Sequence, residues 1–142
     1  MNFLHFTQRL WDRTGRRRRK RLSECESPVE RMFYQAAFDV LKKYDIIPQY
    51  PILRYRADFA IPEERIVIEI DGHNYHSSKK KVAADNKRDR HMLSLGWIVI
   101  RFSGSEVYRN PYDCANEVDA IIIGRRRLRT MTGSIHKGIW RK

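Results

Sequence analysis

The hydrophobic pattern in the first half of the chain predicts one helix followed by an irregular strand. Apolar residues recur at helical spacing over 29–41. Ser27 supplies an N-cap, a proline follows at the first helical position, and Glu30 completes a capping box, so we expect a helix from 28 to about 43. The stretch "IIPQYPILRY" at 46–55 is extended, and its prolines are typical of an irregular or edge strand.

The pattern then switches to strands and returns to helices. "RYRADFAI" and "RIVIEID" predict two strands joined by the turn "PEER", and "WIVIRFS" predicts a fourth strand at 97–103. We expect helices at 80–96, where Gly96 is the stop signal, and at 110–123. The resulting order α-β-β-β-α-β-α predicts an α/β fold with a mixed β-sheet flanked by helices.

Charge divides the chain into a body and two basic ends. Residues 1–22 carry eight Lys or Arg against the single acid Asp12, and residues 124–142 carry seven and no acid, so each end carries +7 and the body carries −2 of the net charge of +12. We predict a basic N-terminal arm (1–26, with a short helix near 3–10), a body (27–123) and a basic C-terminal tail (124–142).

Basic ends on a slightly acidic body predict a polyanionic partner, and the runs "RRRRKR" and "RRRLR" favour nucleic acid over a membrane surface. The alternative is that these runs are solvated and serve solubility alone. The candidate nucleic-acid-binding residues, which include a lysine run at the start of the second predicted helix, are Arg16, Arg17, Arg18, Arg19, Lys20, Arg21, Lys79, Lys80, Lys81, Arg125, Arg126, Arg127 and Arg129.

The cysteine count and the hydropathy indicate which cellular compartment and which stabilising sites to expect. Cys25 and Cys114 lie far apart and form no CxxC pair, so we expect neither a structural zinc site nor a disulfide framework. No stretch approaches the length of a membrane span, and the N-terminus lacks the pattern of a signal peptide. A cytoplasmic, reducing compartment close to the nucleoid fits these features.

The predicted hairpin carries unusual chemistry. With a four-residue loop at 62–65, or a two-residue loop within it, positions whose numbers sum to 127 lie opposite each other. Asp58 then faces Glu69, and Arg56 faces Asp71, all on one face of the hairpin. A loop of three or five residues would break this register. The opposite face is apolar and consists of Phe59, Ile61, Ile66, Ile68 and Ile70.

Two facing carboxylates repel by up to ~1 kcal/mol unless a cation lies between them. Mg²⁺ prefers hard oxygen ligands and usually takes one or two protein carboxylates, with water and phosphate oxygens completing the shell. Asp58 and Glu69 therefore suggest a metal site suited to phosphodiester hydrolysis. The competing interpretation is a solvated strand face on which Arg56 and Asp71 form a weak surface ion pair.

The order of these motifs resembles a known superfamily. "DF", then "IVIEIDG", then a histidine, then "DNKRDRHMLSLGWIVIRF" is similar to the PD-(D/E)XK restriction-endonuclease-like proteins, and most similar to the branch of very-short-patch-repair (Vsr) endonucleases. The resemblance covers residues 27–120 and implies a restriction-endonuclease-like core that cleaves DNA. It also implies Mg²⁺ as the cofactor, with Mn²⁺ as a substitute.

The resemblance assigns roles position by position. Asp58 and Glu69 match the two metal-binding acids, and Asp71 falls where the superfamily has its lysine. Glu30 matches an acid that many members direct into the site from the first helix, an alternative to its capping role. His76 resembles the histidine that Vsr-like enzymes place near the scissile phosphate, and it is otherwise an ordinary loop histidine.

Because Asp71 replaces the lysine of the superfamily motif, another residue must supply the positive charge beside Glu69. Lys87 or Arg88 could supply it, because the catalytic cation lies on a neighbouring helix in some superfamily members. We therefore predict a Mg²⁺-dependent endodeoxyribonuclease, cutting one strand or both, as a homodimer or with a partner protein. The alternatives are a non-catalytic nucleic-acid-binding or assembly protein on the same scaffold, and an RNA-binding protein.

Overall fold

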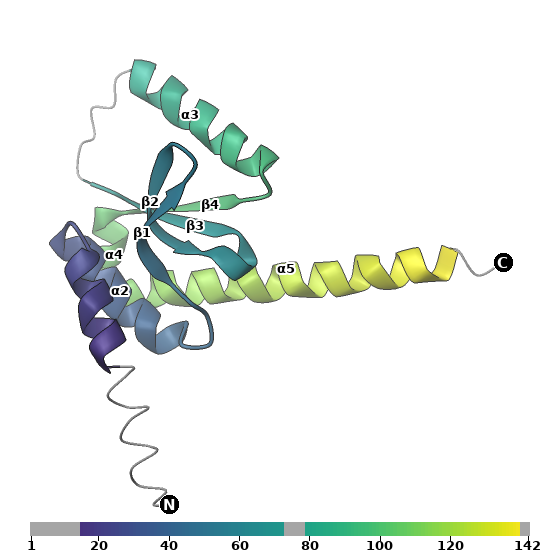
Figure 1. Ribbon diagram of the computed structural model, residues 1–142, viewed down its shortest axis with the longest axis horizontal. Helices are drawn as coiled ribbons and strands as arrows, with labels where there is room; N and C mark the ends of the chain where they lie inside the picture. The colour runs from purple at the N-terminus through teal and green to yellow at the C-terminus, as the bar shows by residue number, and fades with distance from the viewer. Residues whose placement is uncertain (1–14, 73–78, 140–142) are drawn as a thin grey trace, which may run out of the picture.

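A four-stranded mixed sheet forms the centre of the fold (Figure 1). The computed structural model describes residues 15–72 and 79–139, and side chains over 15–72 and 82–132. Neighbouring strands are antiparallel except for the last two, which are parallel, and their order is β1-β2-β3-β4. The strands are β1 (Ile47–Ile52), β2 (Tyr55–Ile61), β3 (Ile66–Asp71) and β4 (Ile98–Ser103).

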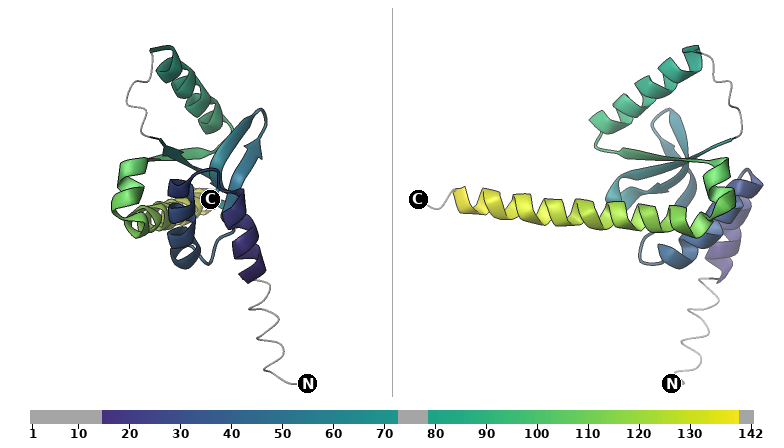
Figure 2. Two further views of the ribbon diagram at one scale, coloured as in Figure 1. Left: turned by 90° about the vertical axis from the view of Figure 1, so that its left-hand side faces the viewer. Right: turned by 180° about the vertical axis from the view of Figure 1, so that it is seen from behind.

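Helices cover both faces of this sheet, as Figure 1 and Figure 2 show. α3 crosses from β3 to β4 on one face, and α2, α4 and α5 lie on the other. The predicted α/β order is confirmed, with α4 and a helix over residues 15–24, here called the arm helix, in addition. The labelled helices are α2 (Pro28–Val40), α3 (Lys79–Ser94), α4 (Gly104–Arg109) and α5 (Pro111–Ile139).

Strand alternation separates a large core from a small one. Phe59 and Ile61 of β2, and Ile66 and Ile68 of β3, pack with α2 and α5 and are fully buried. The opposite face forms a smaller cluster that includes Val67 and Met92, a buried residue of α3. Apolar packing is therefore concentrated on the α2–α5 side, and the α3 side is left with room for polar side chains.

The β2–β3 turn has the predicted length and fixes the predicted register. A 3₁₀ turn over Pro62–Glu64 is followed by Arg65 in the left-handed region, at φ 52°. The pairs Phe59–Ile68, Ala60–Val67 and Ile61–Ile66 all follow the predicted sum of 127. The next pair in this register is Asp58 and Glu69.

α5 is much longer than the sequence pattern predicts. The expected end at residue 123 is wrong, because the helix continues through Gly124 and the basic run to Ile139 (Figure 1). The basic run is also bound to the body. Arg126 Nε donates to Glu64 Oε1 at 2.8 Å and Arg129 Nη2 donates to Glu64 Oε2 at 2.7 Å, and Glu64 is only 4% exposed.

The arm helix is likewise docked. Arg21 Nη1 donates to the Ile46 carbonyl at 2.6 Å, and both Arg17 and Arg21 pair with Asp45. Leu22 packs against the main core, and Cys25, just after the helix, is buried in it. The predicted helix near residues 3–10 lies outside the described residues. No helix in the described ranges is long and apolar enough to cross a membrane.

Candidate active site

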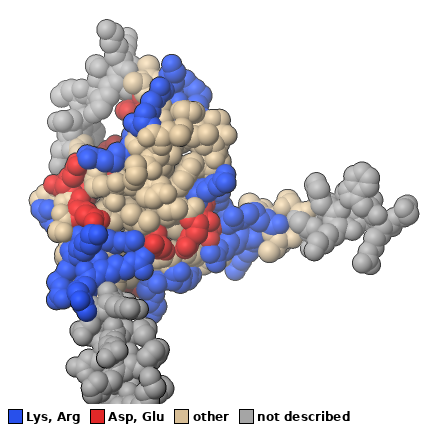
Figure 3. Space-filling view, in the orientation of Figure 1, with Lys and Arg blue, Asp and Glu red and all other residues tan. Residues whose placement is uncertain are grey.

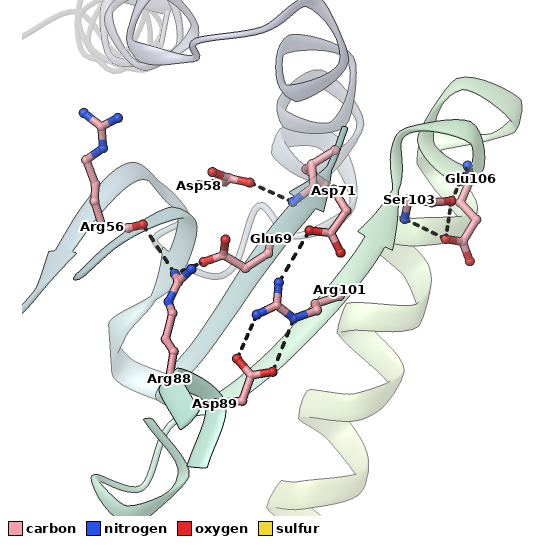
Figure 4. Close-up of polar contacts among 10 residues, drawn as sticks. Arg56, Asp58, Glu69, Asp71, Arg88, Asp89, Arg101, Ser103 and Glu106 are labelled. Atoms are coloured by element: carbon pink, nitrogen blue, oxygen red, sulfur yellow. Dashed lines mark hydrogen bonds and ion pairs between the residues drawn. The ribbon is translucent and has the colours of Figure 1, made fainter. Parts of the chain in front are cut away.

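Three carboxylates gather just beyond the last paired residues of β2 and β3 (Figure 4). Asp58 comes from β2, and Glu69 and Asp71 come from β3. Asp58 Oδ2 accepts a hydrogen bond from the Ile70 N–H at 2.7 Å, so this side chain ties the two strands together where the ladder has ended. Glu69 is only 7% exposed, whereas Asp71 is exposed.

Arg88 of α3 neutralises the buried carboxylate. Its Nη2 lies 2.5 Å from Glu69 Oε1, and its guanidinium also lies over the ring of Tyr55. Two candidates for the missing cation, Lys87 and Arg88, followed from the sequence, and the structure places Arg88 beside Glu69. α3 connects β3 to β4 and thereby places the positive charge of Arg88 beside Glu69 of β3.

The pKa of Glu69 is raised from 4.5 to about 7. Burial is the main cause, the negative charge of Asp58 adds to it, and Arg88 opposes both. Burial likewise raises the pKa of Asp58, against the hydrogen bond from the Ile70 N–H, and the charge of Glu30 raises it further. Both carboxyls therefore hold protons more tightly than isolated acids do, because their ionised forms are poorly solvated and close to one another.

Arg101 is a site residue that the sequence analysis missed. It lies beside Glu69 in the parallel register of β3 and β4. Its guanidinium binds Asp89 through two bonds, of 2.8 and 3.3 Å, and lies 3.4 Å from Asp71 Oδ1 (Figure 4). In the sequence it is one polar residue inside an apolar strand, and only the strand pairing reveals its neighbours.

The expected pairing of Arg56 with Asp71 is wrong. Arg56 instead pairs with Glu26, at 2.5 Å, on the segment that leads into α2. The two strands diverge after the last ladder pair, so the register that places Asp58 beside Glu69 does not extend to the next pair on that face.

Glu30 reaches the site from α2 and is 7% exposed. Ser27 caps the helix as predicted, since its Oγ accepts the Glu30 N–H at 3.1 Å. The reciprocal bond of the capping box differs from the prediction, because Glu30 Oε2 accepts from the Glu26 N–H at 2.9 Å and not from Ser27. Glu30 Oε2 also accepts from Gln49 Nε2 at 3.0 Å.

Gln49 is a second residue that sequence reasoning missed. It interrupts β1 with a positive φ of 50°, a conformation that is unfavourable for a residue with a side chain. The two prolines of "PQYP" indicated an irregular strand, and the irregularity in the structure coincides with the bond from Gln49 to Glu30.

The donor set fits a hard divalent cation. Asp58 and Glu69 offer carboxylate oxygens side by side, and Mg²⁺ commonly takes two such ligands and fills its shell with water and phosphate oxygens. Within the described residues, no group of three or more His, Cys, Asp or Glu is arranged to hold a metal ion. A cage made entirely of protein ligands is thus absent from this part of the chain, and a two-carboxylate site agrees with the residues present.

The remaining predicted site residues are His76 and the basic residues expected to bind nucleic acid. His76 lies outside the described residues, as do the side chains of Lys79, Lys80 and Lys81. The basic residues of the arm helix and of α5 lie on either side of an acidic strip (Figure 3). Arg17 and Arg21 bind Asp45, Arg18 lies over Phe38, Arg126 and Arg129 bind Glu64, Arg125 is half-buried, and Arg16, Arg19, Lys20 and Arg127 are exposed.

Comparisons with known proteins define the class. The family REase_MTES_1575, which is restriction-endonuclease-like, matches residues 33–122. An uncharacterised protein of Haemophilus influenzae is 31% identical over 104 residues, which cover 72% of this chain and 79% of that protein. The uncharacterised protein YcjD of Escherichia coli K12 is 36% identical over 69 residues, about half of each chain (49% and 52%).

Among solved structures, the catalytic domain of the homing endonuclease I-Bth0305I aligns with 75% of this chain and 97% of its own, at 16% identity and a TM-score of 0.46. The match to the family profile covers more than half of the chain. The chain therefore belongs to the restriction-endonuclease-like family REase_MTES_1575. This membership points to a nuclease.

Proposed function

We propose that the protein is a Mg²⁺-dependent DNA endonuclease in which Asp58 and Glu69 hold the metal. The observation that carries this proposal is a pair of neighbouring carboxyls, one 7% exposed and both with raised pKa values, placed where two strands end their pairing. Perturbed acids of this kind are concentrated at functional sites, because a buried carboxylate lowers stability and is kept for its chemistry.

The surrounding residues position and neutralise these acids. When bound, the metal polarises the phosphate and activates a water molecule. Arg88 supplies the cation that the missing motif lysine would provide, and it is in place to turn from Glu69 toward a phosphate oxygen. Arg101 holds Asp71 at the edge of the site, and Gln49 binds the Glu30 carboxylate, whose charge raises the pKa of Asp58.

The basic residues on the arm helix and α5 would contact the DNA backbone. Arg19, Lys20 and Arg127 are exposed and suited to bind phosphates, while four other arginines are held by Asp45 and Glu64. The placement within the Vsr-like branch, and the role of His76 near the scissile phosphate, rest on the motif resemblance. The proposed enzyme cuts one DNA strand or both, and it acts alone or as a homodimer.

The test is cleavage of supercoiled plasmid and of a branched synthetic DNA, with Mg²⁺, Mn²⁺ or chelator. We expect metal-dependent cleavage that Asp58→Ala abolishes while salt-sensitive DNA binding is retained. Glu117→Ala, which removes an exposed acid on α5, is the matched control and should cleave at the wild-type rate. An undiminished rate in Asp58→Ala would contradict the proposed role of the carboxylate pair.

A second candidate is a non-catalytic nucleic-acid-binding protein on the same scaffold. The observation that favours it is the Arg88–Glu69 ion pair, which already satisfies the buried acid without a metal. Melting temperatures with and without Mg²⁺ or Mn²⁺ separate the two, because a ligand at 100 times its Kd stabilises the native state by ~2.7 kcal/mol. Metal-linked stabilisation that Glu69→Ala removes supports the enzyme, and its absence supports the scaffold.

A further inference from the structure

The turn of the β1–β2 hairpin carries an exposed leucine in an unfavourable backbone conformation. Ile52 pairs with Tyr55, so Leu53 and Arg54 alone connect the two strands. Leu53 has a positive φ of 53° and is 72% exposed. Two-residue hairpin turns need a positive φ and usually place glycine, asparagine or aspartate there, because a bulky side chain is unfavourable in that region. Leu53 therefore adds little to packing and opposes the turn, which points to contact with a partner.

The outer half of this hairpin is a two-stranded ribbon. β2 pairs with β3 only through Phe59, Ala60 and Ile61, whereas its pairs with β1 continue up to the turn. Figure 1 and Figure 2 show the ribbon extending from the sheet on the side of α3. Ile52, next to the turn, is buried in the cluster that includes Met92 of α3. The ribbon is thus fixed to the body while its turn faces solvent.

Arg54 is held in place and connects the turn to the acidic site. Its side chain is exposed, its Nη2 donates to the Tyr55 hydroxyl at 3.1 Å, and its guanidinium lies 5.2 Å from the centroid of that ring. The Arg88 guanidinium lies over the same ring, at 5.6 Å, and its Nη2 binds Glu69. The turn therefore presents an apolar side chain and an ordered cation, and a single aromatic ring separates that cation from the arginine of the acidic site.

We propose that the β1–β2 turn enters the major groove of duplex DNA, where Arg54 binds a phosphate and Leu53 contacts the C5-methyl group of thymine. The inference rests on the proposed function for its DNA partner. The major groove is ~12 Å wide and admits a two-stranded β-ribbon, and the thymine methyl is the apolar group on the base edges there. Arg54 and Arg88 match the charge of the phosphate backbone. A single leucine is too small an apolar surface to hold a membrane.

The consequence is a preference for thymine over uracil beneath the turn, because uracil lacks the methyl group. Fluorescence anisotropy measures it with two duplexes that differ only in this group, one of alternating adenine and thymine and one in which deoxyuridine replaces thymidine. The full chain is used in chelator, so that binding is measured without cleavage and the result does not depend on catalysis.

We expect the wild type to bind the thymine duplex about fourfold more tightly, the value of one buried methyl group. Leu53→Gly should bind both duplexes equally. Arg54→Ala should weaken binding to both and keep the preference for thymine, because it removes a phosphate contact and leaves the leucine in place.

Two measurements separate this contact from general effects. Leu93→Ala is the matched control, since Leu93 is 66% exposed on α3 and lies outside the hairpin, and it should retain the wild-type preference. Leu53→Gly should not melt below the wild type, because glycine accepts the positive φ, so unfolding cannot explain a lost preference.

The outcomes distinguish this inference from the proposed function. Equal binding of the two duplexes by the wild type overturns the contact with thymine and leaves DNA binding intact. A preference that persists in Leu53→Gly also overturns it, because the discrimination then arises elsewhere in the chain. Absence of binding to either duplex contradicts the proposed DNA substrate itself, and the inference fails with it.

Discussion

The raised pKa of Glu69 makes stability depend on pH in a way that one substitution can isolate. The carboxyl has a pKa of about 7 in the native chain against an ordinary 4.5, so the native state keeps a proton over this range that the unfolded chain releases. The stabilisation from Glu69 is fully present below pH 4.5 and is lost as the pH rises through 7. Over about 2.5 pH units, at ~1.4 kcal/mol each, the loss amounts to about 3 kcal/mol.

Urea denaturation of the wild type and of Glu69→Gln, from pH 4.5 to pH 8.5, measures this loss directly. Glutamine keeps the shape and cannot ionise, so the free energy of unfolding of the wild type should fall by about 3 kcal/mol relative to the variant between pH 4.5 and pH 7. Above that range the difference should be constant. Glu117→Gln, at an exposed position on α5, should track the wild type throughout.

Metal should oppose the same effect, because a divalent cation binds only the ionised carboxylates and displaces the proton. Saturating Mg²⁺ is therefore expected to reduce the wild-type loss above pH 7 and to leave Glu69→Gln little changed. A wild-type curve parallel to that of Glu69→Gln across the whole range would refute the reasoning, since it would mean that Glu69 titrates near its ordinary value.

Three further predictions concern Arg88, the buried acid Glu64 and the exposed cations of the arm helix. Arg88→Ala should raise the pKa of Glu69 above its present value of about 7 and slow metal-dependent cleavage by ~100-fold or more, with partial recovery in Arg88→Lys, as followed by carboxyl NMR titration and plasmid nicking. Glu64→Gln should lower the free energy of unfolding by ~2 kcal/mol at neutral pH, because it weakens the bonds from Arg126 and Arg129 that hold the pKa of Glu64 down against the effect of burial. This stabilisation is lost in acid, so the urea denaturation curves of wild type and variant should converge as the pH falls below 4.5. Arg19→Ala and Lys20→Ala should each reduce the salt dependence of DNA binding by a slope of about 1, measured by anisotropy against salt concentration, whereas an unchanged slope would exclude a phosphate contact at that residue.

The hairpin was predictable because turn length and strand alternation act over short distances. The turn "PEER" and the alternation of Phe59, Ile61, Ile66 and Ile68 were enough to place Asp58 beside Glu69. The neighbours of Arg101 were not predictable, because they depend on the parallel pairing of β4 with β3, two strands separated by a whole helix. Arg56 was mispredicted because strand divergence depends on tertiary packing.

The helical extent of the two basic ends was not predicted, for a different reason. The last helix was expected to end at residue 123, but a single glycine inside a helix, here Gly124, costs only ~1 kcal/mol, and the bonds from Arg126 and Arg129 to Glu64 offset it. In the arm helix, arginine is itself a good helix former, and Arg21 finds partners on the body. Charge density alone does not show which cations have acidic partners within the same chain.

The separation of packing and chemistry onto opposite faces of the β2–β3 hairpin has an evolutionary consequence. Substitutions on the polar face leave the main core intact, and replacing the buried acid removes a pH-dependent cost to stability. If the acids serve the proposed reaction, losing them is a step toward greater stability, and selection for that reaction is what keeps them in place. Inactive descendants that retain the fold and the basic surfaces are an expected product of such an architecture.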